Sequence, residues 1–144
     1  MGRTTARAAA MQLAYERLLG GQGGGETLGL VYEHLGEGKE NAPSSEDQKY
    51  IDEVLSGIAA HQEEIAQQIE EFSVDWSLER MAKVDLTILR LAAYEILFRE
   101  DVPGSVAINE AVELAGKYSD PAGSRFINGV LGSILRKKEA GQKK

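Results

Sequence analysis

The sequence contains no cysteine, which excludes disulfide bonds, thiolate zinc sites and a cysteine nucleophile. Long apolar runs are absent as well, because no stretch approaches the ~20 apolar residues that a membrane-spanning helix needs. The N-terminal segment also lacks the apolar core, about 7–15 residues long, of a secretory signal peptide. We therefore expect a cytoplasmic protein that makes no use of a membrane.

Patterns that would indicate catalysis or a cofactor are missing too. The glycine-rich segment GGQGGG at 20–25 lacks the Lys-Ser/Thr of a phosphate-binding loop, and we interpret it as a flexible linker. The two histidines are isolated, and His61 with Glu64 gives a single helical pair, whereas a metal site in a bundle needs ligands from several helices. No strained turn marks a nucleophilic serine. The sequence predicts no catalytic residue, no metal and no cofactor.

Acidic residues outnumber basic ones, 23 to 16, but the two kinds are unevenly distributed. The first 20 residues carry three arginines against one glutamate, and the last 20 carry six basic residues against one glutamate. If the fold brings these ends together, they form a basic patch that attracts phosphates. The alternative is that both ends are solvated termini that only aid solubility.

Helical periodicity of apolar residues runs along almost the whole chain, so we predict an all-α fold, a single-domain bundle of about seven helices over residues 1–144. Residues 1–3 and 137–144 are expected to fray. The segment 84–99 is apolar nearly all round and is predicted to be the central buried helix. The other helices are expected at about 4–18, 27–35, 46–71 with a break near His61, 78–81, 106–118 and from 121 onward.

Local signals place several helix starts. Thr4 and Thr5 are suitable N-caps for the first helix, Ser45 with Gln48 fits a capping box, and Ser105 is placed to cap the helix at 106–118. Asp120-Pro121 combines an N-cap acid with proline at the first helical position. Asn128, in the last helix, is assigned to hydrogen bonding within the core.

Four pieces occur in fixed order between Val84 and Leu135: LRLAAYEI, a D-V-P turn, VAINEAVELAGKYS and RFINGVLGSIL. In this order they resemble the C-terminal half of the NusB family of transcription antitermination factors. Arg7, followed by the pattern A-x-Q-x-x-Y at 10–15, is similar to the family's first helix, and residues 47–58 are similar to its third. The resemblance spans most of the chain and fails mainly at the glycine linker, at 36–44 and over the last eight residues.

The resemblance implies a non-catalytic adaptor. NusB proteins bind the single-stranded boxA element of nascent RNA together with NusE, a ribosomal protein of the small subunit. The pair helps to assemble an antitermination complex on RNA polymerase at ribosomal RNA operons. Members could be monomers or dimers.

The family positions carry over to particular residues. By resemblance, RNA binding falls on Arg3, Arg7, Gln12, Tyr15, Ser124, Arg125 and Phe126, and NusE binding on Glu79 and Asp85. Guanidinium groups suit phosphates and aromatic rings suit base stacking, whereas carboxylates suit a basic ribosomal protein. The chain departs from the family at Thr4 and Thr5, where members often carry arginine, and at Ala122, where many carry an acid.

Other interpretations remain open at this point. Tyr15 and Phe126 lie near apolar stripes and are equally good core aromatics, and the two carboxylates could simply belong to the acidic surface. A NusB-like domain also accompanies some RNA cytosine methyltransferases, but no α/β pattern or cofactor-binding glycine loop follows the helices here. The remaining alternative is a non-catalytic helical scaffold or homodimerisation module.

Overall fold

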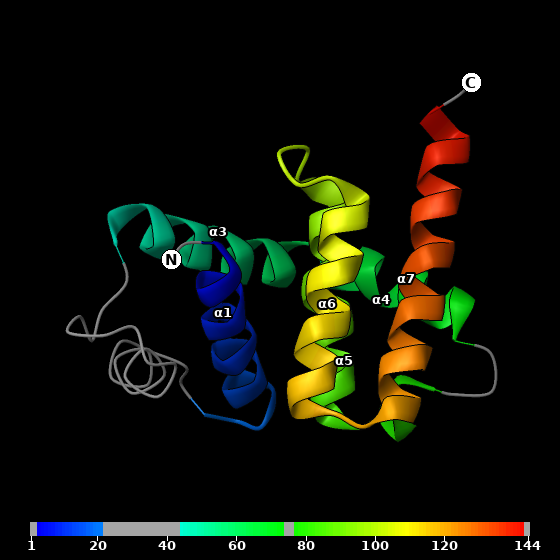
Figure 1. Cartoon of the computed structure of the whole chain (residues 1–144), viewed down its shortest axis with the longest axis horizontal. Coiled ribbons are helices and arrows are strands. Elements are labelled where there is room, and N and C mark those ends of the chain that lie inside the picture. Colours follow the sequence, from blue (N-terminus) through cyan, green and yellow to red (C-terminus); the bar gives the residue numbers. More distant parts are fainter. Residues whose placement is uncertain (1–2, 22–43, 74–76, 143–144) are drawn as a thin grey trace. The chain divides into compact units, whose positions relative to one another are not determined.

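The computed structural model describes residues 3–21, 44–73 and 77–142, and within these ranges all regular structure is helical, which confirms the predicted all-α class. The helices are α1 (Arg3–Leu18), α3 (Ser45–Ala60), α4 (Gln62–Phe72), the short 3-10 helix η1 (Leu78–Arg80), α5 (Lys83–Phe98), α6 (Gly104–Tyr118) and α7 (Pro121–Gln142) (Figure 1). The helix expected at 27–35 lies outside the described residues. The chain divides into two compact units, residues 1–57 and 58–144, and each is described by itself.

The first unit contains α1 and most of α3. α1 begins at Arg3, so Thr4 and Thr5 lie inside the helix and are not its caps, contrary to expectation. α3 begins at Ser45, and its cap is the preceding Ser44, whose hydroxyl accepts the backbone N–H of Asp47 at 3.1 Å. The capping signal was therefore real but one residue earlier than predicted.

The second unit is built around α5, as the sequence predicted. Every residue from Leu86 to Ile96 except Arg90 is buried, and α5 contacts α4, α6 and α7. The break expected near His61 is present, because α3 ends at Ala60 and α4 begins at Gln62. The His61 ring stacks on Phe98 at the end of α5, with 3.8 Å between ring centroids. Packing of this ring therefore links the start of α4 to the end of α5.

The turn between α5 and α6 brings the start of α6 close to α7. α6 begins at Gly104 after Pro103, without the side-chain cap expected from Ser105. A Cβ at Gly104 would lie 2.4 Å from Cδ1 of Leu135, far inside van der Waals contact. A side chain at this position would force the Leu135 side chain to shift, so glycine suits the close approach of α6 to α7.

α7 is longer than the sequence indicated, since it continues to Gln142 instead of fraying from 137. Two lysines hold its last turns against the unit. Lys137 Nζ lies 2.7 Å from the Glu71 carboxylate of α4, and Lys138 donates to the backbone carbonyl of Ile96 near the end of α5. Cations near a helix C-terminus satisfy its free carbonyl groups, so part of the basic tail has a structural use.

Candidate nucleic-acid interface

The start of α7 is fixed by its own cap. The Asp120 carboxylate accepts the backbone N–H of Gly123 at 2.6 Å, and Pro121 occupies the first helical position. This confirms the start predicted from Asp120-Pro121. The next three residues, Ser124, Arg125 and Phe126, therefore lie within the first two turns of a capped helix.

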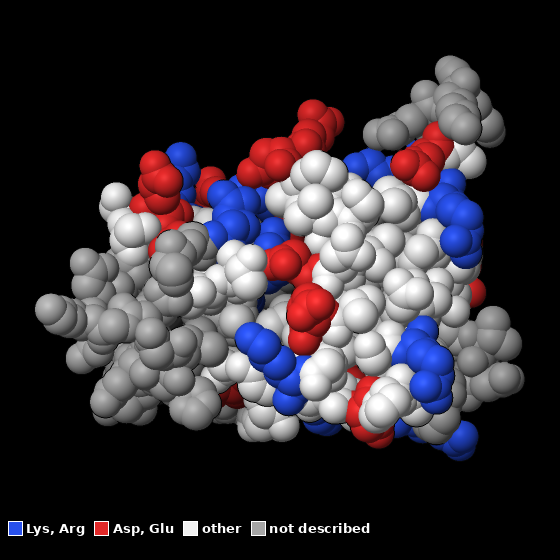
Figure 2. Space-filling model, in the orientation of Figure 1, with Lys and Arg blue, Asp and Glu red and all other residues white. Residues whose placement is uncertain are grey.

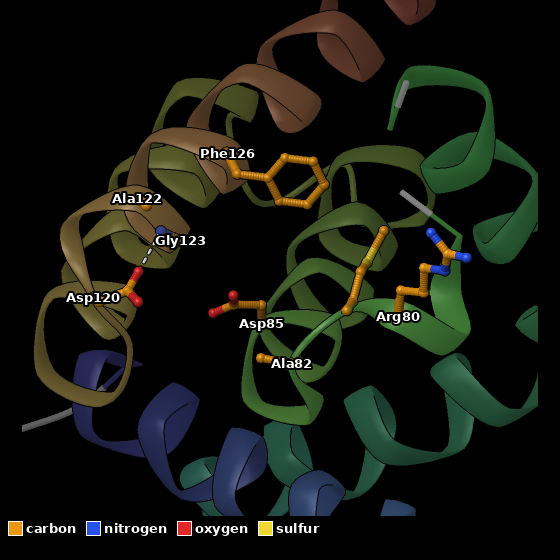
Figure 3. A pocket seen from close by; sticks show the side chains of 8 residues that line it. Arg80, Ala82, Asp85, Asp120, Ala122, Gly123 and Phe126 are labelled. Carbon is orange, nitrogen blue, oxygen red and sulfur yellow. Dashed lines mark hydrogen bonds between the residues drawn. The ribbon is translucent and has the colours of Figure 1, made fainter. Parts of the chain in front are cut away.

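A cavity of about 300 Å³ opens beside this turn, between η1, the start of α5 and the start of α7. It is lined by Arg80, Met81, Ala82, Asp85, Asp120, Ala122, Gly123 and Phe126. The Phe126 ring projects from α7 into this space, and the Asp85 side chain points toward the start of α7 (Figure 3). The cavity therefore combines the aromatic ring of Phe126 with two carboxylates and one guanidinium group. It can offer a ligand both apolar and polar contacts.

Asp85 joins three helices in this wall. Its carboxylate accepts the hydroxyl of Ser119, which follows α6, at 2.5 Å. A Cβ on Gly123 would come within 2.2 Å of the Ser119 hydroxyl oxygen and 2.9 Å of an Asp85 carboxylate oxygen. A side chain at Gly123 would therefore force this pair or the start of α7 to shift. The half-buried Asp85 is thus a structural group as well as a candidate contact.

The three predicted RNA contacts on α7 point in different directions. Successive helix residues are rotated by about 100°, so Arg125 faces outward while Ser124 and Phe126 lie on its two flanks. Arg125 is exposed and no acidic side chain pairs with it in the described part of the chain. Phe126 is half-buried at the cavity, intermediate between a core aromatic and a free stacking face. Arg125 and Phe126 together offer a cation and a ring at one end of the unit.

On α1, the two arginines converge on one aromatic ring. The guanidinium carbon of exposed Arg3 lies 4.3 Å from the centroid of the Tyr50 ring, and that of Arg7 lies 5.7 Å from it. Arg7 is only 3% exposed, although it is predicted to contact RNA. Its guanidinium packs inside the protein in this conformation, and of the two only Arg3 is accessible to a phosphate.

Gln12 and Tyr15 occupy another side of α1. Both are half-buried, and Gln12 lies about 180° around the helix from Arg3. The four predicted RNA contacts of α1 therefore do not form one continuous face of that helix. They separate into an arginine pair near its start and a Gln-Tyr pair one to two turns later.

Of the two acidic residues predicted to bind NusE, the structure describes the side chain of Asp85 alone. Asp85 stands in the first turn of α5, where a carboxylate also interacts favourably with the helix dipole. Glu79 lies in η1, but its side chain is outside the described residues. η1 and the first turn of α5 are consecutive in the chain and both contribute to the cavity wall.

Sequence reasoning missed two members of these sites. Tyr50 was not singled out, although arginines four residues apart share a helix face and commonly stack on an aromatic ring. Ser119 was missed because it pairs with a residue 34 positions away. No local pattern reveals such a long-range hydrogen bond. Asn128 was assigned to the core, yet it is exposed and its side chain makes no hydrogen bond within the described structure.

A second cavity, of about 590 Å³, lies beside the start of α4 and includes His61, Glu63, Glu64 and Arg90 in its lining. Burial lowers the pKa of Arg90 from its ordinary value. Across the described ranges, no group of three or more His, Asp or Glu side chains is arranged to hold a metal ion. In the same ranges, none of the helices combines the length and apolarity needed to cross a membrane.

Comparison with known proteins gives one consistent family. The NusB family model matches residues 4–136. A transcription antitermination protein NusB of Clostridium novyi (strain NT) is 41% identical over 136 residues, 94% of this chain and 99% of that protein. The NusB of Acetivibrio thermocellus is 44% identical over 138 residues, 96% of this chain and 91% of that protein. Among solved structures, a chain from a crystal structure of antitermination factors NusB and NusE in complex with dsRNA superposes with a TM-score of 0.77 at 28% identity, covering 94% of this chain and 96% of that one.

Proposed function

This chain belongs to the NusB family, and we propose that it is a transcription antitermination factor that binds RNA together with NusE. The observation that supports this most directly is the N-terminal end of α7, where unpaired Arg125 and cavity-lining Phe126 follow a capped helix start. A solved NusB–NusE–dsRNA complex shares the fold at 28% identity. We propose single-stranded boxA-type RNA as the natural ligand.

For RNA, we propose that Arg3 and Arg125 contact phosphates and that Phe126 stacks on a base at the cavity mouth. Gln12, Tyr15 and Ser124 are half-buried and are proposed as secondary contacts at the edges of these sites. Arg7, which is buried, is proposed to act indirectly by holding the Tyr50 ring on which Arg3 rests. RNA affinity therefore depends on Arg7 through the shape of the first unit.

For NusE, we propose that the surface formed by η1 and the first turn of α5 is the docking site. Asp85 is supported by its place in the cavity wall, where Ser119 fixes its carboxylate. Glu79 is carried over from the family position alone. Acidic groups on this surface would attract a basic ribosomal protein and orient it.

The two units are proposed to work as one NusB domain, since the family match runs through both of them. We propose that the protein has no reaction of its own and acts in the cytoplasm as an adaptor in an RNA polymerase antitermination complex. We also propose that, without RNA, the protein can form a homodimer that covers the RNA surface. The scaffold function is the outcome that remains if RNA and NusE fail to bind.

Fluorescence anisotropy of a labelled boxA-type RNA tests the proposal, with a scrambled RNA of equal composition as the control. Both RNAs are titrated with the full chain in the presence of NusE at about 50 and 200 mM salt, because phosphate contacts weaken steeply over this range. We expect tighter binding of the boxA-type RNA and a loss of affinity with salt. Equal, weak binding of both RNAs would reject the function and leave only the fold.

A further inference from the structure

The outer face of α7 carries a stripe of residues that begins at Arg125 and continues beyond the proposed RNA site. Arg125, Gly129, Gly132 and Arg136 recur at spacings of three and four residues, so they lie along one line of the helix. The opposite side of α7 is buried, and it carries Ile127, Val130, Leu131 and Ile134. The stripe is therefore the part of α7 that faces farthest from the core of its unit.

Both ends of this stripe are cationic and lack acidic partners. The Arg125 side chain forms no hydrogen bond or ion pair within the described structure, and the Arg136 side chain donates to the hydroxyl of Ser133 in its own helix, at 3.0 Å. In Figure 2 basic side chains gather at two places along α7, with uncharged surface between them. In a chain of net charge −7, two such exposed arginines on one face form a local anion-attracting line.

The two glycines in the middle of the stripe leave the helix backbone there accessible. A Cβ on Gly129 would meet nothing within 4 Å, and one on Gly132 would meet only the flexible tip of Arg136, at 3.3 Å. Neither glycine is needed for packing inside the chain, although each costs the helix roughly 1 kcal/mol relative to alanine. Asn128 beside them is exposed and its side chain makes no hydrogen bond in the structure described. Its amide can therefore donate to and accept from a base edge.

We propose that RNA flanking the boxA-type element continues from the start of α7 along this stripe to Arg136. The inference rests on the proposed function and extends its RNA site, which already includes Arg125. Arg125 and Arg136 contact phosphates about 16 Å apart along the helix axis, Asn128 contacts a base, and the two glycines let the strand approach closely. The path ends at Glu139, whose exposed carboxylate repels phosphate.

Arg136 has a matched control in its neighbour. Lys137 has the same charge, but its ammonium group is paired with Glu71 at 2.7 Å and its Cα is rotated away from the stripe. Arg136→Gln and Lys137→Gln therefore change the net charge equally and differ in whether they touch the stripe. Circular dichroism of both variants would establish that each retains the helical fold.

The experiment measures RNA affinity of the full chain by anisotropy with three RNAs. They are the boxA-type core and the same core extended by about six nucleotides at either end, which exceeds the ~16 Å between the two arginines. We expect one extended RNA to bind several-fold tighter than the core. Arg136→Gln should abolish that gain and reduce the salt slope for that RNA by about 0.7, the value for one phosphate contact on a single strand. Lys137→Gln should preserve the gain.

The possible failures are distinguishable. If the core binds but neither extension adds affinity, the stripe is not an RNA path and the proposed function stands. If both variants lose affinity equally, the effect is one of net charge and the path is rejected. If Arg136→Gln instead weakens NusE binding and leaves all three RNAs unchanged, the stripe is a protein surface. If the unchanged protein fails to bind the core, both proposals fall.

Discussion

Gly123 shows how a single missing side chain shapes the candidate site. Its backbone N–H is bound by the Asp120 cap, and a Cβ here would collide with the Asp85–Ser119 pair, so glycine lets α7 begin at the cavity without moving that pair. The sequence shows a glycine in a helix and nothing more. The reason for it depends on two residues distant in the chain and is visible only in the fold.

Gly123→Ala should destabilise the protein, because its Cβ would lie 2.2 Å from the Ser119 hydroxyl oxygen and force α7 to shift. We expect a loss of about 1–3 kcal/mol in the free energy of unfolding, measured by urea denaturation. Gly129→Ala is the matched control, since its Cβ would meet nothing within 4 Å. It should stabilise by roughly 0.5–1 kcal/mol. A Gly123 variant as stable as the control would show that the close approach is not rigid.

Arg3 and Arg7 lie about one turn apart on α1, but they differ in burial. Arg7 is 3% exposed, whereas Arg3 is exposed. Arg7→Ala should lower the free energy of unfolding by about 1–3 kcal/mol because a buried polar group loses its packing and partners. Arg3→Ala should change stability by less than about 0.5 kcal/mol and weaken RNA binding at low salt. A stable Arg7→Ala protein with weakened RNA binding would instead make Arg7 a direct contact.

At the scale of elements, apolar periodicity predicted the described helices well, whereas capping chemistry placed only the start of α7 correctly. The central position of α5 followed from its apolar composition, and the start of α7 followed from Asp120-Pro121. Errors arose where the deciding contact is not local. α6 begins without the expected Ser105 cap, and α7 continues past residue 136 because Lys137 and Lys138 bond to α4 and α5. Such contacts between helices leave no periodic signal in the sequence.

The Asp85–Ser119 hydrogen bond connects α5 with the residue that follows α6. Two variants can separate the charge of Asp85 from its structural role. Asp85→Asn keeps an acceptor for the Ser119 hydroxyl and removes the charge, whereas Ser119→Ala removes the bond and keeps the charge. If the carboxylate attracts NusE, only Asp85→Asn should weaken NusE binding, by several-fold at low salt. Calorimetric titration of both variants with NusE checks this. Equal losses would assign Asp85 a purely structural role.

At the scale of the whole molecule, the charge pattern along the chain predicted a basic patch made by the two ends. The structure distributes the basic residues of those ends among different tasks. Arg7 is buried and two C-terminal lysines bond within the protein, while Arg3, Arg125 and Arg136 remain exposed. Net charge and its distribution along the chain cannot reveal which cations are used internally, since that depends on how the helices pack.

The most direct test of the account is the coupling between NusE and RNA on this protein. Labelled boxA-type RNA is titrated with the chain at increasing NusE, and labelled NusE is titrated with the chain at increasing RNA. If both ligands bind the adaptor together, each should tighten the other by the same factor, expected between about 5-fold and 150-fold. RNA affinity that is unchanged by saturating NusE, and equal for a scrambled RNA, would contradict the account.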